Sequence, residues 1–113
     1  MRPSRERVIV ELENLDQAEK VEETIRTGYC DLIAENLIAW IAAEEDLTES
    51  YTKLSEKYKE KREVSDGLRE LADESGNITG IVRTILKSIE DMQKIMDKRR
   101  TILQLLSQKN GSP

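Results

Sequence analysis

Apolar residues recur at alternating steps of three and four along two long stretches, and this spacing is the strongest constraint on the fold. The first stretch runs from Cys30 to Tyr58 and the second from Val64 to Leu106. Such spacing is typical of long helices that pack side by side in a left-handed bundle. No long stretch alternates apolar and polar residues at every second position, so we expect no sheet.

Two lines of residues are predicted to form the seam between these helices. On the first helix the line is Cys30, Ile33, Leu37, Trp40, Glu44, Leu47, Tyr51, Leu54 and Tyr58. On the second helix it is Val64, Leu68, Leu71, Ser75, Ile78, Val82, Ile85, Ile89, Met92, Met96, Arg99, Leu103 and Leu106. The second helix carries a further apolar line, which indicates contact with more than one neighbour: Ile81, Ile95, Ile102 and Leu105.

The chain is expected to form one helical domain with short flanking segments. Residues 1–14 are an N-terminal arm that could be a short helix or a strand, residues 15–108 are the helical bundle domain, and residues 109–113 are a disordered tail. Gly28 and Gly76 are the positions where a helix could break.

A turn is expected in the charged stretch 59–63. If it centres near Glu60, residues whose numbers add to about 120 lie opposite each other, and Glu44 faces Ser75. The predicted fold is all-α, an antiparallel hairpin of long helices. Because a lone hairpin leaves much of its apolar face in water, we expect a four-helix bundle completed by dimerisation.

The chain contains no histidine, and this absence excludes histidine-based nucleophile activation, general-base catalysis and metal ligation. We assign no catalytic and no cofactor-binding residue, so an enzyme is less expected than a non-enzymatic protein. With a net charge of -5, no nucleic-acid partner is expected. Two basic spots, at Arg2, Arg5 and Arg7 and at Lys98, Arg99 and Arg100, are interpreted as solvated ends rather than as a phosphate site.

The single cysteine, Cys30, lies among apolar residues and is predicted to be a buried, inert thiol. No apolar run approaches the length of a membrane span, and the first residues lack the apolar region of a signal peptide. The expected location is the cytoplasm, without a membrane partner.

Glu44 is the candidate site residue, because it is the one charged residue in the first predicted seam. A carboxylate between packed helices is costly unless it is paired, protonated or bound to a metal. The structural alternative is that Glu44 turns to the seam edge, where it reaches water or a lysine or fixes the helix register.

The stretch from Asn36 to Glu44, followed by Tyr51 and Thr52, resembles the first helix of rubrerythrin and related ferritin-like proteins. The resemblance covers residues 36–82 and implies a ferritin-like bundle in which Glu44 takes the role of the metal-binding glutamate. The stretch from Leu68 to Ile78 resembles the first half of the family's next helix. Where the family has its Glu-x-x-His ligands, this chain has Ser75 and Ile78.

Three functions follow as alternatives. The first is a ferritin-like bundle that has lost its di-metal site and acts as a structural or protein-interaction module, as a homodimer or with an unidentified protein partner. The second is a metal protein of the same fold that holds iron or manganese through carboxylates, for which Glu74 and Asn77 offer a shifted ligand pair. The third is a coiled-coil adaptor unrelated to ferritins. The carboxylates expected near one level are Glu44, Glu45, Asp46, Asp73 and Glu74.

Overall fold

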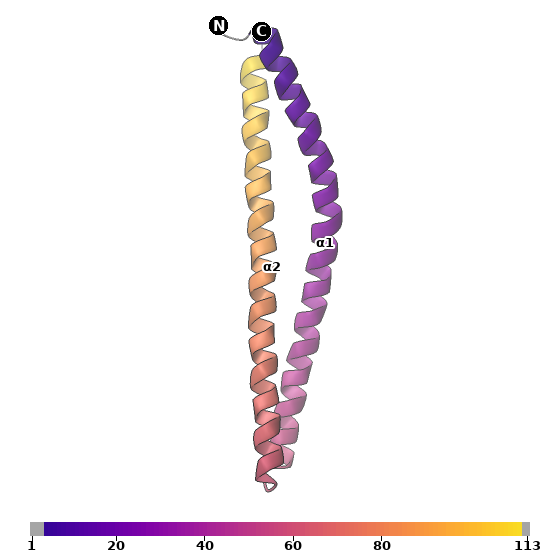
Figure 1. The fold of residues 1–113 in the computed structure, drawn as a ribbon, viewed down its shortest axis with the longest axis vertical. Coiled ribbons are helices and arrows are strands. Elements are labelled where there is room, and N and C mark those ends of the chain that lie inside the picture. The colour runs from indigo at the N-terminus through magenta and orange to yellow at the C-terminus, as the bar shows by residue number, and fades with distance from the viewer. Residues whose placement is uncertain (1–3, 112–113) are drawn as a thin grey trace. The chain divides into compact units, whose positions relative to one another are not determined.

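The computed structural model describes residues 4–111, which form two long α-helices (Figure 1). Helix α1 spans Arg5–Lys57 and helix α2 spans Arg62–Gly111. Ser4 caps α1, because its hydroxyl oxygen accepts the backbone N–H of Arg7 at 3.2 Å. Residues 4–111 contain no strand. The all-α prediction is therefore confirmed for the part of the chain that the structure describes.

The flanking segments differ from the prediction. Residues 5–14 are helical and continuous with the rest of α1, so the strand alternative for the arm is wrong there. Residues 109–111 continue α2 where a disordered tail was expected. Residues 1–3, 112 and 113 lie outside the described residues.

The glycines do not break the helices. Gly28 lies inside α1, and Gly76 and Gly80 lie inside α2. A Cβ atom added at any of these three glycines would meet nothing within 4 Å. The glycines of α2 therefore mark neither a break nor a close approach to another helix.

The chain divides into two compact units. The turn unit is Leu32–Ile89, and the terminal unit consists of Met1–Asp31 and Glu90–Pro113. In each unit a segment of α1 runs antiparallel to a segment of α2.

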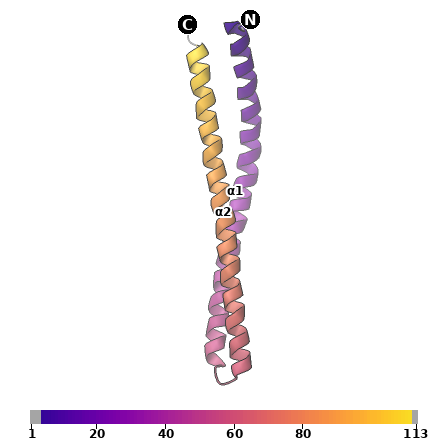
Figure 2. The ribbon, with the colours of Figure 1, turned by 60° about the vertical axis from the view of Figure 1, so that its left-hand side comes forward.

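A tight turn joins the helices within the turn unit (Figure 2). Residues 58–61 separate the end of α1 from the start of α2, and the N–H of Lys61 donates to the carbonyl of Tyr58 at 2.9 Å. Glu60 lies inside this turn, so the predicted position of the turn is confirmed.

Two serines hold the helices together beside the turn. The hydroxyl of Ser55 donates to the carbonyl of Ser65 at 2.8 Å, and the hydroxyl of Ser65 donates to the carbonyl of Ser55 at 2.8 Å. Both side chains are buried, with 4% and 3% of their surface exposed. A side chain that bonds directly to the opposite backbone requires a close approach of the two helices. Because 55 and 65 add to 120, this contact agrees with the predicted helix register.

Burial identifies the residues of the turn unit that face the opposite helix. On α1 they are Ala34, Leu37, Ile41, Glu44, Thr48, Tyr51 and Ser55. On α2 they are Ser65, Leu68, Ala72, Ser75, Thr79, Val82, Leu86 and Ile89. These residues follow the expected steps of three and four, and they are buried or half-buried. Beyond the small residues beside the turn, Leu37, Ile41 and Val82 form a core cluster with Leu86 and Ile89 packed against it.

The predicted seam is therefore correct in about every second position and wrong in the others. In the turn unit, the residues predicted inside but found partly exposed beside the seam are Ile33, Trp40, Leu47 and Leu54 on α1, Tyr58 in the turn, and Val64, Leu71, Ile78 and Ile85 on α2. In the terminal unit, Met92 and Leu106 are likewise partly exposed. The physical reason is the close approach at Ser55 and Ser65. It requires a small side chain at every second seam position near the turn, as at Thr48 and Ala72, and the larger apolar residues next to these positions lie to one side of the seam.

We expect Ser65→Leu to lower the free energy of unfolding by about 2–3 kcal/mol, because a large side chain cannot fit where the helices touch. Ser65→Ala should cost only about 1 kcal/mol, since it removes one hydrogen bond and keeps the space. Denaturant unfolding of both variants measures the difference. Thr84→Leu, at an exposed position of α2, is the control and should change stability little. Equal costs for Ser65→Leu and Thr84→Leu would contradict the close approach.

Candidate functional site

The turn unit has one apolar side and one polar side. In heptad notation the seam residues occupy positions a and d. The a residues are Ala34, Ile41, Thr48 and Ser55 on α1 and Ser65, Ala72, Thr79 and Leu86 on α2. The positions that flank the seam are g, one residue before a, and e, one residue after d. In an antiparallel pair of helices, both g lines lie on one side of the seam and both e lines lie on the other. All eight g residues are large and apolar, and each is more than a third exposed; we call this surface the apolar face: Ile33, Trp40, Leu47, Leu54, Val64, Leu71, Ile78 and Ile85.

The opposite side of the turn unit is more polar. It carries an ion pair between Arg83 of α2 and Glu45 of α1, both at position e. Thr52 and Arg69 line a small hollow on the same side, together with Ser55 and Glu56. The helix pair is therefore amphipathic as a whole, because its ion pair and its apolar face lie on different sides.

Glu44 sits at the seam next to Trp40 of the apolar face. The indole Nε1–H of Trp40 donates to Oε1 of Glu44 at 3.2 Å. The second carboxylate oxygen, Oε2, is buried and has no hydrogen-bond partner among residues 4–111. Glu44 contacts Trp40 and not a lysine, in contrast to the structural alternative considered above. The carboxylate instead lies in the seam with one satisfied oxygen and one unsatisfied oxygen, which is an energetic cost to the fold.

The other predicted site residues do not join Glu44 in a metal-binding group. Ser75 is buried in the seam, whereas Ile78 lies on the apolar face. Glu45 pairs with Arg83, and Asp46, Asp73, Glu74 and Asn77 are exposed. Within residues 4–111, no three Cys, Asp or Glu side chains come together in a way that could hold a metal ion.

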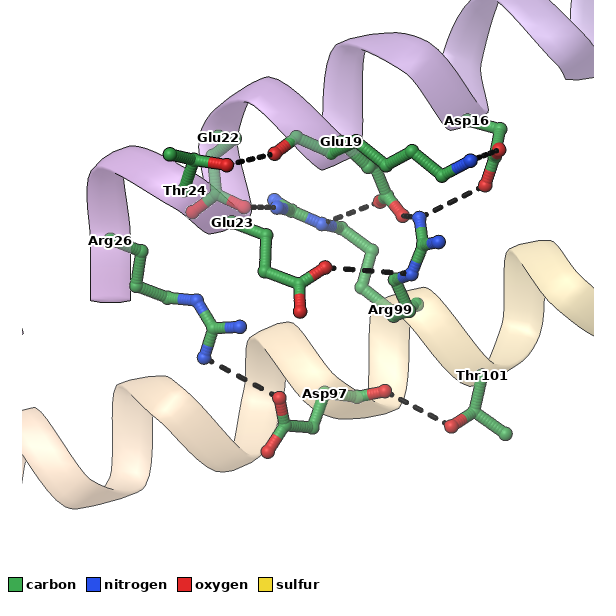
Figure 3. A network of polar contacts seen from close by, with 11 residues as sticks. Asp16, Glu19, Glu22, Glu23, Thr24, Arg26, Asp97, Arg99 and Thr101 are labelled. Atoms are coloured by element: carbon green, nitrogen blue, oxygen red, sulfur yellow. Dashed lines mark hydrogen bonds and ion pairs between the residues drawn. The ribbon is translucent and has the colours of Figure 1, made fainter. Parts of the chain in front are cut away.

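In the terminal unit, ion pairs occupy much of the interface between the helices (Figure 3). Arg99 pairs with Glu19 and with Glu22, both at 2.8 Å. Arg100 pairs with Asp16 at 2.9 Å and with Glu23 at 3.7 Å. The Arg100 side chain is only 24% exposed. The prediction that Arg99 and Arg100 form a solvated basic end is therefore wrong, because carboxylates of α1 neutralise them.

Two further contacts extend this network. Arg26 of α1 pairs with Asp97 of α2 at 3.4 Å. Asp16 also contacts Lys20 at 3.1 Å. The hydrogen bond from Lys20, supported by the charges of Lys20 and Arg100, holds the pKa of Asp16 below its ordinary value of 3.8. Since a lowered pKa favours the folded state only while the group is ionised, this contribution is present above that ordinary value and is lost as the pH falls through the lowered one.

An apolar groove lies beside the network in the terminal unit. Its volume is about 340 Å³, and Cys30 at its edge is buried, with 6% of its surface exposed, as predicted. Sequence reasoning did not identify this groove, because its walls come from both helices. We call it the terminal groove; its lining residues are Ala18, Val21, Glu22, Ile25, Arg26, Tyr29, Cys30, Met92 and Met96.

Sequence reasoning also missed the ion-paired network, although a signal for it was present. Asp16, Glu19, Glu23 and Arg26 follow steps of three and four on α1, as seam residues do. The register that sets residues adding to about 120 opposite each other places this line against Arg99 and Arg100. Charged residues at the spacing of seam residues were therefore the sequence signal for this ion-paired interface.

We expect Arg100→Gln to lower the free energy of unfolding by about 1–2 kcal/mol, because it leaves several carboxylates of α1 without their shared cation. Amide hydrogen exchange should quicken in the terminal unit and stay unchanged in the turn unit. Lys98→Gln is the control, since Lys98 is exposed and has no ion pair among residues 4–111. Added salt should weaken the wild type more than Arg100→Gln. An identical salt response in both proteins would contradict a role for the network.

We expect Glu44→Gln to be neutral or to stabilise the fold by up to about 1–2 kcal/mol. The amide retains an oxygen that can accept from Trp40, and it removes a charge whose second oxygen is buried without a partner. Thermal unfolding compares the two proteins, and elemental analysis measures their iron and manganese. Lower stability together with loss of a bound metal would instead identify Glu44 as a ligand.

Comparison with protein-family models, curated proteins and solved structures finds no match to this chain. Neither helix, over the residues that the structure describes, is apolar enough over a sufficient length to cross a membrane.

Proposed function

We propose that this protein is a non-enzymatic structural module, a helical bundle that assembles with a second copy of itself through its apolar face. The observation that carries the proposal is the distribution of apolar residues. Among the described residues only six apolar side chains are buried, namely Cys30, Leu37, Ile41, Ala72, Val82 and Leu103. A much larger number of Leu, Ile, Val, Met, Trp and Tyr side chains are exposed.

The exposed apolar side chains gather on one side of the turn unit. All eight residues of the apolar face are more than a third exposed. A contiguous exposed apolar surface of this kind marks an interaction site. A second copy of the chain would cover this face, and pairing two helix pairs gives a four-helix bundle.

A ferritin-like origin is part of the same proposal and rests on the resemblance over residues 36–82. A ferritin-like bundle needs four helices, which two copies supply. Ser75 and Ile78 stand where that family has its Glu-x-x-His ligands, and this replacement supports a structural role in place of metal chemistry.

A coiled-coil adaptor is the second candidate, and the terminal groove favours it. Tyr29, Met92 and Met96 line this groove. Methionine side chains are flexible and adapt to differently shaped partners. An adaptor would receive a helix of another protein there, and its purified chain would remain a monomer.

Sedimentation over micromolar concentrations tests the proposal. Wild type should be a dimer or larger. Leu47→Glu puts a charge on the apolar face, and it should weaken assembly by about 100-fold or more because the charge would be buried. Ile38→Glu is the matched control, because Ile38 is also an exposed apolar residue of α1 but lies at position e on the opposite side. A wild-type monomer at all concentrations would overturn the proposal and favour the adaptor.

A further inference from the structure

We infer that acid opens the terminal unit and leaves the turn unit closed. Opening means that the α1 segment and the α2 segment of the terminal unit separate from each other. The inference concerns each unit by itself, goes beyond the proposed assembly and is tested separately from it. It follows from the different contacts that hold the two helix pairs together.

The terminal unit contains little apolar packing between its helices. Among residues 4–31 and 90–109, the buried apolar side chains are Cys30 and Leu103. The turn unit instead has a core cluster of Leu37, Ile41 and Val82. Closure of the terminal unit therefore depends on its charged groups more than closure of the turn unit does.

The charged groups of the terminal interface attract each other only while the carboxylates are ionised. The carboxylates are Asp16, Glu19, Glu22 and Glu23 of α1 and Asp97 of α2. The cations are Lys20 and Arg26 of α1 and Arg99 and Arg100 of α2. Protonation of the carboxylates removes these ion pairs and leaves cations on both helices, which repel each other. Acid thus converts the attraction between the two segments into repulsion.

The polar groups of this interface are incompletely satisfied even when the unit is closed. Oε2 of Glu19 and Nε of Arg26 are buried and have no hydrogen-bond partner among residues 4–111. Each such atom reduces the stability of the closed pair. A hollow of about 160 Å³ lies between these side chains and Arg99 and Arg100, and it is large enough for water. Protons can therefore reach the carboxylates before the helices separate.

The pH of opening follows from the carboxyl groups. Ordinary carboxyl groups take up protons near pH 4. The hydrogen bond from Lys20 holds the pKa of Asp16 below its ordinary value of 3.8, so its stabilising contribution persists to lower pH and is lost as the pH falls through the lowered pKa. We expect opening between about pH 4 and about pH 2.

Acid removes little from the turn unit. The hydrogen bonds between Ser55 and Ser65 involve no group that takes up a proton in this range. The seam carboxylate Glu44 accepts a hydrogen bond from an indole and not from a cation. Arg83 and Glu45 do pair between the helices, but each side chain is more than half exposed, and exposed pairs contribute little. The turn unit should therefore remain paired.

Distances between two spin labels in one chain test the inference, with Cys30→Ala removing the native thiol. Labels at Gln17→Cys and Gln104→Cys report on the terminal unit, and labels at Asn36→Cys and Thr84→Cys in a second chain report on the turn unit. All four residues are exposed. Excess unlabelled chain is added, so that only distances within one copy are measured. Acidification to about pH 2.5 should abolish the distance found at neutral pH for the terminal pair and keep that of the turn pair. An unchanged terminal distance, or loss of both distances together, overturns the inference.

Amide substitutions link the opening to the ion pairs. Asp16→Asn with Glu19→Gln removes one carboxylate from Arg100 and one from Arg99, so the terminal pair should separate at a higher pH than in the unsubstituted chain. Glu13→Gln with Asp31→Asn is the matched control, because both are exposed carboxylates of α1 outside the ion pairs described above. It should leave the pH of opening unchanged. The same pH of opening in both variants overturns the inference.

Discussion

The close approach of the two helices beside the turn is the constraint on which the rest of the turn unit depends. Ser55 and Ser65 donate hydrogen bonds to each other's carbonyl groups, so the two backbones must lie close together. Near this contact every second seam position holds a small side chain, and Thr48 and Ala72 continue the pattern. The larger apolar side chains are consequently displaced to the g positions, where they form the apolar face. The close contact between the two helices thus places the large apolar side chains on one exposed surface, which a second helix pair would cover in the proposed assembly.

The terminal unit also leaves apolar side chains exposed, but for a different physical reason. Its helix interface is lined by charges, and the apolar side chains of the same segments, including Ile25 and Ile95, are exposed. In an interface of this kind the opposite charges specify which segments of the two helices pair, but the interface contributes little hydrophobic stabilisation. Both units therefore leave apolar surface unburied, one because its seam is narrow and the other because its seam is charged.

The sequence was sufficient to predict the helices, the turn and the register. The three-four spacing and the scarcity of helix breakers predicted two long helices, and the Ser55–Ser65 contact agrees with the expected pairing. Which residues face inward was predicted only in part. On each helix two neighbouring lines of residues, the g residues and the a residues, had the spacing of a seam. The g residues are the more apolar, so the prediction placed them in the seam although they lie beside it. The small polar residues of the seam, such as Ser55 and Ser65, carry no hydrophobic signal, and only the contact between the backbones selects them.

The contrast between the two helix interfaces also has a consequence for temperature. The turn unit has an apolar core around Val82, and hydrophobic stabilisation weakens on cooling. The charged interface around Arg100 responds in the opposite sense, because the cost of removing charged groups from water falls as the temperature rises. Cooling should therefore loosen the helix pairing of the turn unit, while warming relatively favours that of the terminal unit. A single chain would then keep some part of its helix pairing over a wider range of temperature than either kind of interface would allow by itself.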